Sequence, residues 1–269
     1  MLTARGRAMC TPGVALGGFL YAVGGQDAES SGTPSLASVE RYDIVSGQWS
    51  AVASMATART WSAAVALGGH VYAIGGYNGG YSNADLDSVE RYDPDSDSWS
   101  FMQHLSVTRS RPGAVALGGF IYAIGGHSGF QTSVERYDPG TNTWTAVASM
   151  NKGRAGMGTA LLDSKIFVAG GHWGDDGFFT SEAVAYTAET YDPSTDSWTL
   201  LSSLMTEKRN LFALAAFNGY LYAFGFEYVP TGECVDSIEK YDPQADAWAV
   251  LNGVTHSNGA HCQAAAVVI

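Results

Sequence analysis

One ten-residue segment occurs three times in this chain, nearly unchanged. It reads LGGFLYAVGG at residues 16–25, LGGHVYAIGG at 67–76 and LGGFIYAIGG at 117–126, and degenerate copies follow at 162–171 and 217–226. Five copies at nearly regular spacing indicate internal repeats. A period of about fifty residues is typical of proteins that stack one supersecondary unit many times.

A tryptophan marks the same phase of every repeat, with successive spacings of 50, 45, 54 and 50 residues. Each tryptophan stands seven residues after a tyrosine, and the linking text is YDIVSGQW in the first repeat and YDPDSDSW in the second. Proline presets φ and short polar side chains bond the nearby backbone, so this text predicts a hairpin turn between two strands. The marks are Trp49, Trp99, Trp144, Trp198 and Trp248, with Tyr42, Tyr92, Tyr137, Tyr191 and Tyr241.

Two further strands are expected upstream of that hairpin. AAVAL at 63–67 is a short apolar run of the kind a buried strand needs, and VYAI at 71–74 is β-branched and aromatic. The Gly-Gly that follows tolerates positive φ and lets another backbone approach closely. Each repeat then holds four short strands, which we name A, B, C and D in chain order. Such strands indicate a sandwich, barrel or propeller. The fixed period selects an all-β propeller, because each sheet must stack on an identical neighbour.

The bulk composition supports a large core and excludes several functions. The chain has 269 residues, of which 46% are apolar, and no apolar stretch near twenty residues, so we expect no membrane span. The net charge of −12 argues against nucleic-acid binding, which needs a basic surface. Three cysteines cannot form a disulfide framework, which favours a reducing, cytoplasmic setting.

Almost all length variation between repeats falls in one connection, between strands B and C. The interval from each tryptophan to the next Gly-Gly is 27 or 28 residues, whereas the interval from there to the next tyrosine ranges from 11 to 20. A rigid scaffold with one variable loop set is how binding surfaces are commonly built. These loops also carry aromatics that can anchor a partner or cover a small core of the loop itself. They are Tyr77, Tyr81, Phe130, Trp173, Phe178, Phe179 and Tyr228.

An arginine precedes every A strand in a strict phase, four residues after a methionine or leucine. Two interpretations stay open. The guanidinium forks could bind the carboxylates of an acidic ligand at a positively charged mouth. Alternatively, each arginine pairs with an Asp or Glu of a neighbouring blade, because a residue present in every blade usually serves the blade. The phased arginines are Arg5, Arg59, Arg109, Arg154 and Arg209. We expect a structural role for Glu40, Glu90, Glu135, Glu189 and Glu239, which stand two residues before the phased tyrosines.

The order Gly-Gly, Glu-x-Tyr-Asp-Pro and Trp is similar to the kelch repeat over essentially the whole chain. The segment SVERYDPDSDSW and the preceding M-x-x-x-R resemble the kelch half of the BTB–kelch ubiquitin-ligase adaptor proteins. The resemblance implies a β-propeller that a C-terminal strand closes and that presents substrate proteins to a cullin-type ligase. Docking to the ligase would need a BTB part, which is absent from this chain.

The resemblance also implies where a ligand binds. In such adaptors the connection between strands D and A lies on the same face as the B–C loop. Ligands there contact the arginine, the small polar residue after it, and the residue after Gly-Gly. We therefore expect a protein or peptide ligand, acidic in character, and no cofactor or metal. The expected contact residues are Arg59, Thr60, Arg109, Ser110, Arg111, Arg154, Arg209, Asn210, Tyr77, Tyr81, His127, Phe130, His172, Trp173 and Tyr228.

The repeat count leaves the number of blades open. We expect a single domain over residues 1–269, with five repeats and a closing strand near 261–269. That segment, HCQAAAVVI, resembles an A strand without a following B strand. It either competes with residues 10–16 for the first blade of a five-bladed ring, which we prefer, or begins the sixth blade of a truncated protein.

Two other functional classes remain as alternatives to a binding module. A propeller enzyme of the galactose-oxidase type would need copper, histidine ligands and a tyrosine cross-linked to a cysteine. His127 and His172 share a phase, but no third histidine does, and Cys10, Cys234 and Cys262 have no compelling partner. The chain is therefore not expected to be an enzyme. A truncated or engineered repeat scaffold with no ligand is the other alternative.

Overall fold

The structure is a computed structural model and describes residues 5–6, 13–27, 34–79, 84–127, 129, 131–171, 186–225 and 237–255. Within these residues every regular element is a β-strand. None of them belongs to a helix that could cross a membrane. Contacts divide the chain into two compact units, one holding blades 1 and 2 and the other blades 4 and 5, with the division inside blade 3.

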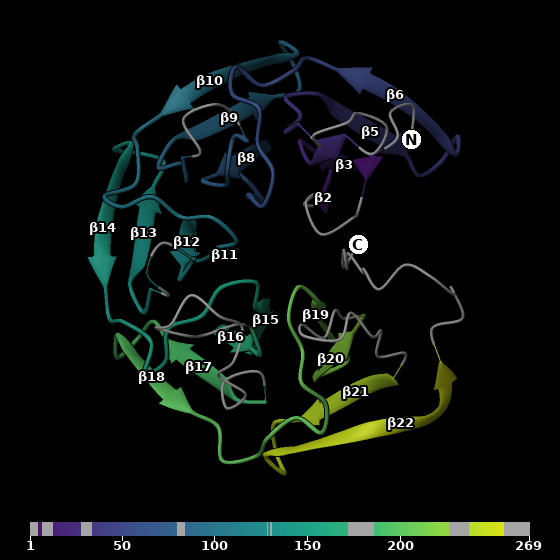
Figure 1. The fold of residues 1–269 in the computed structure, drawn as a ribbon, viewed down its shortest axis with the longest axis vertical. Helices are drawn as coiled ribbons and strands as arrows, with labels where there is room; N and C mark the ends of the chain where they lie inside the picture. The colour runs from purple at the N-terminus through teal and green to yellow at the C-terminus, as the bar shows by residue number, and fades with distance from the viewer. Residues whose placement is uncertain are drawn as a thin grey trace. The chain divides into compact units, whose positions relative to one another are not determined.

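Five four-stranded sheets follow one another along the chain, and the strands of each follow the chain order A, B, C, D, with β4 intervening between B and C in blade 1 (Figure 1). Blade 1 contains β2 (Gly13–Leu16), β3 (Phe19–Val23), β5 (Val39–Asp43) and β6 (Gln48–Val52). Blade 2 contains β7 (Ala63–Leu67), β8 (His70–Ile74), β9 (Val89–Asp93) and β10 (Ser98–Met102). Blade 3 contains β11 (Gly113–Leu117), β12 (Phe120–Ile124), β13 (Val134–Asp138) and β14 (Thr143–Val147). Blade 4 contains β15 (Gly158–Leu162), β16 (Lys165–Ala169), β17 (Ala188–Asp192) and β18 (Ser197–Leu200). Blade 5 contains β19 (Ala213–Phe217), β20 (Tyr220–Phe224), β21 (Ser237–Asp242) and β22 (Ala247–Thr255).

The expected fold class, an all-β propeller with five four-stranded blades, is confirmed by these sheets. The expected closing strand near 261–269 lies outside the described residues. In blade 1 the A position is held by β2 from the N-terminal part of the chain. A sixth, two-stranded sheet pairs β1 (Arg5–Gly6) with β4 (Gln26–Asp27).

The phased tyrosine and tryptophan pair across the hairpin between strands C and D, as their spacing predicts. In blade 2, Tyr92 is opposite Trp99 in antiparallel register, and their ring centroids are 5.2 Å apart. The Asp93 carboxylate closes the turn by accepting the Asp95 N–H at 2.9 Å, and this bond lowers the pKa of Asp93. The Tyr-Asp-Pro sequence therefore supplies the residue that closes the turn.

The core lies between successive blades rather than inside one sheet. We call the side of a blade that packs on the next blade in the chain its leading face. Tyr21 on the leading face of blade 1 meets Tyr92 of blade 2, with ring centroids 5.8 Å apart. Phe167 of blade 4 meets Tyr241 of blade 5 in the same way, at 6.2 Å. Because each sheet is covered only by its neighbours, every blade needs the same set of apolar residues.

Polar contacts between neighbouring blades recur in blades 2 to 5. Asp97, in the C–D turn of blade 2, accepts the Tyr92 hydroxyl at 2.7 Å and the Ala53 N–H of blade 1 at 2.9 Å. The Trp99 indole N–H donates to the Ala53 carbonyl at 2.8 Å. These bonds hold the turn of one blade on the strand D end of the blade before it. The residues at the Asp97 position in the other blades are Gly47, Asn142, Asp196 and Asp246.

Candidate protein-interaction site

The D–A connection that leads into a blade contains the phased arginine, whose main chain bonds the blade before it. The Arg59 carbonyl accepts the Gly25 N–H at 2.7 Å, and its own N–H donates to the Leu36 carbonyl at 2.9 Å. A Cβ on Gly24 would lie 2.5 Å from the Arg59 carbonyl oxygen. This close approach explains the repeated Gly-Gly, because no side chain fits between the two backbones.

The arginine side chain turns into the blade that follows. Arg59 donates from Nη1 to the Gly75 and Ser88 carbonyls, each at 2.8 Å, and from Nη2 to the Glu90 carboxylate at 2.9 Å. Glu90 also accepts the N–H groups of Ala56 and Thr57. One buried ion pair therefore fastens the connection to strand C, while the arginine backbone holds the previous blade.

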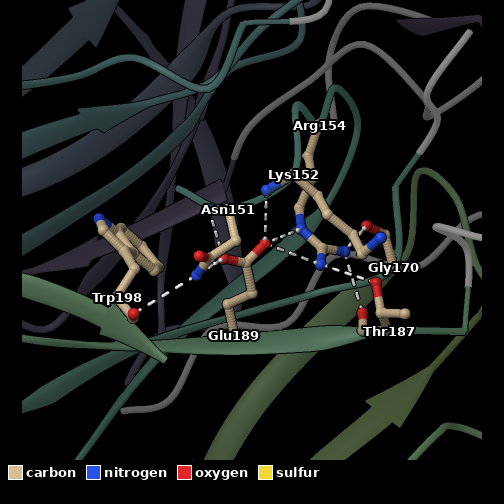
Figure 2. Close-up of polar contacts among 7 residues, drawn as sticks. All are labelled: Asn151, Lys152, Arg154, Gly170, Thr187, Glu189 and Trp198. Atoms are coloured by element: carbon tan, nitrogen blue, oxygen red, sulfur yellow. Dashed lines mark hydrogen bonds and ion pairs between the residues drawn. The ribbon is translucent and has the colours of Figure 1, made fainter. Parts of the chain in front are cut away.

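The same pair occurs in blades 3, 4 and 5, and Figure 2 shows it in blade 4. There Arg154 meets Glu189 at 3.1 Å and donates to the Gly170 carbonyl at 2.8 Å. Glu189 accepts three further N–H groups, from the backbone and amide of Asn151 and the backbone of Lys152. Every oxygen of the carboxylate thus faces a donor, which is what a buried charge requires.

Burial lowers the pKa of the Arg59, Arg109 and Arg154 guanidinium groups, and the paired glutamates raise it again. The ordinary pKa of arginine is so high that these groups stay charged at neutral pH. The side chains of Arg59, Arg109, Arg154 and Arg209 are 0% exposed. This placement differs from the expectation that these four arginines meet a ligand. Their guanidinium groups are enclosed and engaged with glutamate, so in this structure they offer nothing to a partner.

The residue two positions after each phased arginine forms a second repeating feature. Trp61, Arg111 and Leu211 stand there with positive φ values of 54°, 54° and 55°, and Gly156 stands there with 65°. The Arg111 N–H donates to the Trp61 carbonyl at 2.7 Å, and the Leu211 N–H donates to the Gly156 carbonyl at 2.7 Å. We call these four residues the rim. Their backbone conformation is constant, whereas their side chains differ completely.

A cation and two aromatic rings gather at the rim of blades 2 and 3. The Arg111 guanidinium lies over the Trp61 ring, 4.0 Å from its centroid, and Trp61 packs on Tyr77 with centroids 5.4 Å apart. All three side chains are partly exposed. Tyr77 follows Gly-Gly and pairs with Thr60 through two backbone hydrogen bonds of 2.9 and 2.7 Å. These bonds place the B–C loop beside the D–A connection, as the sequence resemblance implies.

Polar atoms without a partner in the described part of the chain lie beside this cluster. They are the Thr60 hydroxyl, the Trp61 indole N–H and the Ser62 hydroxyl, three consecutive residues. Unsatisfied buried donors and acceptors are uncommon in proteins and call for water or a ligand group. The cluster therefore combines a partly exposed cation and two partly exposed aromatic rings with three buried polar atoms.

The other expected contact residues divide into three groups. Thr60, Ser110 and Asn210 are 1%, 2% and 9% exposed, so only their edges reach the surface. His127 is exposed. Tyr81, Phe130, His172, Trp173 and Tyr228 lie outside the described residues. Trp61 was missed by the sequence interpretation, although it stands at the same distance from its phased arginine as Arg111 does, and that shared phase could have revealed it.

A metal centre has no support among the residues that the structure describes. Nowhere in these residues do three or more His, Cys, Asp or Glu side chains come together to hold an ion. Cys10, Cys234, Cys262 and His172, which an oxidase-type copper site would need, lie outside the described residues.

Together, the phased blades and the buried arginine–glutamate pairs define a β-propeller repeat protein. The family model for the kelch motif matches residues 7–56, 59–106, 108–151 and 153–205. The chain belongs to the kelch-repeat family.

Individual relatives show less about this chain than the family model does. Kelch-like protein 3 of Mus musculus is 38% identical over 66 residues, which are 24% of this chain and 10% of that protein, and the Rattus norvegicus protein matches to the same extent. The match thus spans a tenth of the length of these relatives. A solved structure entitled "Structure of YjhT" superimposes with a TM-score of 0.75 at 17% identity, covering 90% of this chain and 83% of that chain. At this identity the likeness shows the fold alone.

Proposed function

We propose that this chain is a protein-interaction module whose partner binds over the rim and the adjoining B–C loops. The observation that carries the proposal is the rim itself. Four blades hold one strained backbone conformation at this position, yet display Trp, Arg, Gly and Leu there. A scaffold role would favour one residue in all blades, and left-handed φ in bulky residues is characteristic of functional positions.

The ligand that fits this surface is an acidic peptide segment. Arg111 is the rim cation, and its stacking on Trp61 fixes the plane of the guanidinium fork for a carboxylate. Tyr77 and Trp61 supply rigid aromatic area of the kind that anchors interfaces. The buried phased arginines support the surface from within.

The finer role follows the likeness to kelch-like proteins. We propose that the chain acts in the cytoplasm as the substrate-recruiting part of a ubiquitin-ligase adaptor, with ligase docking supplied by a BTB part. Nucleic acids and membranes are not expected partners, because the chain carries a net charge of −12.

Selection of a phage-displayed peptide library on the purified chain tests the binding role. We expect enrichment of peptides with clustered Asp or Glu next to an apolar residue. Arg111→Glu should abolish that enrichment, because it places a carboxylate against the ligand's own. Arg136→Glu is the matched control, since Arg136 lies over the Phe120 ring at 4.5 Å but belongs to strand C. Equal enrichment by both variants, or no enrichment by the native chain, would contradict the proposal.

A further inference from the structure

The last strand of blade 2, β10, is an edge strand without the features that normally protect one. Within the described residues no strand pairs with its far edge (Figure 1). Its sequence, SWSFM, contains no charged residue and no proline, and its register with β9 is continuous from Ser98 to Met102. Natural edge strands usually carry a lysine, a proline or a bulge that prevents pairing with another chain. The backbone of β10 can therefore accept a further strand.

A large apolar side chain is exposed on this same strand. Phe101 is 55% exposed. It lies two residues after Trp99, so the two side chains are on one face of the sheet, and Trp99 is partly exposed as well. An exposed, hydrophobic edge strand is a place where a strand of another chain can pair.

The D strands of the other blades lack this combination. The position of Phe101 holds Ala51 in β6 and Ala146 in β14. In β18 it holds Leu200, which is the last residue of that strand. In blade 5 the ladder of β21 and β22 contains a register shift, which interrupts regular pairing. The repeat therefore does not require an aromatic residue at this position.

The sequence of β10 is complementary to itself in antiparallel orientation. When Ser100 of one copy lies opposite Ser100 of another, Phe101 of each copy lies directly opposite Trp99 of the other. Cross-strand aromatic pairs of this kind stabilise antiparallel sheets. The same register sets Ser98 opposite Met102, so no like charges meet along the paired strands. A two-fold axis at Ser100 relates the copies, which is the symmetry of most homodimers.

We propose that β10 pairs with β10 of a second copy of this chain, so that the two blades form one continuous sheet. The contact is small, because each strand contributes five residues, and the dimer belongs to the weak class. The net charge of −12 on each chain opposes association, and salt screens that repulsion. The dimer therefore forms at high protein concentration and is strengthened by added salt.

Sedimentation velocity over a range of protein concentrations tests the pairing and needs no peptide ligand. We expect a reversible equilibrium between monomer and dimer. Phe101→Lys should raise the dissociation constant at least about tenfold, because it removes both aromatic pairs with Trp99. Ala51→Lys is the matched control, since Ala51 is exposed at the same position of β6, and it should leave the constant unchanged.

Two results of this experiment would overturn the proposal. One is a native chain that stays monomeric at the highest concentration, which would leave the edge to a strand of a different protein. The other is a dimer that Phe101→Lys and Ala51→Lys weaken equally. Both substitutions fall on exposed side chains, and circular dichroism verifies that each variant is folded.

Disulfide cross-linking tests the register. The three native cysteines are changed to serine, and Ser100→Cys then places two thiols opposite each other at the two-fold axis, with Cβ atoms about 4.5–5.5 Å apart. With oxidised glutathione as the oxidant, we expect the dimer to form at least about tenfold faster than with Ser50→Cys, the exposed counterpart on β6. Equal rates, or cross-linking of Ser100→Cys that Phe101→Lys does not slow, would refute this register.

Discussion

Replacing Glu90 with glutamine should cost the first three blades more stability than any surface substitution. Glu90 accepts the Ala56 N–H at 2.7 Å, the Thr57 N–H at 3.0 Å and the Arg59 guanidinium at 2.9 Å, and it is 1% exposed. Glutamine fills the same space but removes the charge and turns one acceptor into a donor. Arg59 then remains charged and enclosed without its counterion.

The expected loss is about 3–5 kcal/mol, the usual cost of removing one partner of a buried ion pair. For a domain of this size that corresponds to a fall in melting midpoint of roughly 5–15 °C. The assay is thermal and urea unfolding followed by circular dichroism. The internal control is the exposed pair His104 and Asp87, whose atoms are 3.1 Å apart and whose side chains are 52% and 46% exposed. Asp87→Asn should cost less than about 1 kcal/mol.

A double substitution separates the ion pair from the rest of the site. Arg59→Met with Glu90→Leu removes both charges, and should be more stable than Glu90→Gln alone because no unpaired charge stays buried. If Glu90→Gln shifts the midpoint no more than Asp87→Asn does, the buried pair does not hold the connection. The interpretation of the phased arginines as blade fasteners would then be refuted.

Three further outcomes follow from the same geometry. Gly75→Ala should destabilise by several kcal/mol in urea unfolding, because the new Cβ lies 2.4 Å from the Arg109 carbonyl oxygen. Gly68→Ala is the control, since Gly68 has the same φ of 59° but nothing within 4 Å of the new Cβ, and it should cost only about 1 kcal/mol of backbone strain. Asp97→Ala should cost about 1–3 kcal/mol in the same assay, because it leaves the Ala53 N–H and the Tyr92 hydroxyl without their acceptor. Hydrogen bonds from Ser194 and the charge of Lys165 lower the pKa of Asp192 to about 2, so its contribution is present above pH ~4 and is lost as the pH falls toward 2; Asp192→Asn should flatten stability against pH in that window.

The strands of this protein could be predicted closely from the sequence because the same strand pattern occurs in every repeat. AAVAL at 63–67 forms β7, and the Tyr-Asp-Pro text forms the C–D turn of blade 2 as expected. Tertiary context rarely overrides a local pattern that occurs five times, since all copies must suit the same neighbour.

The role of the phased arginines could not be predicted from the sequence. Both the pairing and the binding interpretation fit a residue that recurs in every blade, and arginine is seldom fully enclosed unless it is paired. The decisive fact is that in blades 2 to 5 the glutamate two residues before the tyrosine reaches the arginine from strand C, as Glu90 does to Arg59 at 2.9 Å. Neither residue is near the other in sequence, so only the sheet register brings them together.

The rim offers the sharpest separation of binding from stability, through Arg111→Gly. The native residue holds φ at 54°, which costs a side chain about 1 kcal/mol and costs glycine nothing. The stacking of Arg111 on Trp61 returns about 0.5–1 kcal/mol at a partly exposed site. The two effects nearly cancel, so the free energy of unfolding should stay within about 1 kcal/mol of that of the native protein. Capture of acidic peptides should nevertheless be lost. A loss above about 2 kcal/mol would show that Arg111 serves the fold, and unchanged peptide capture would remove the rim from the binding site.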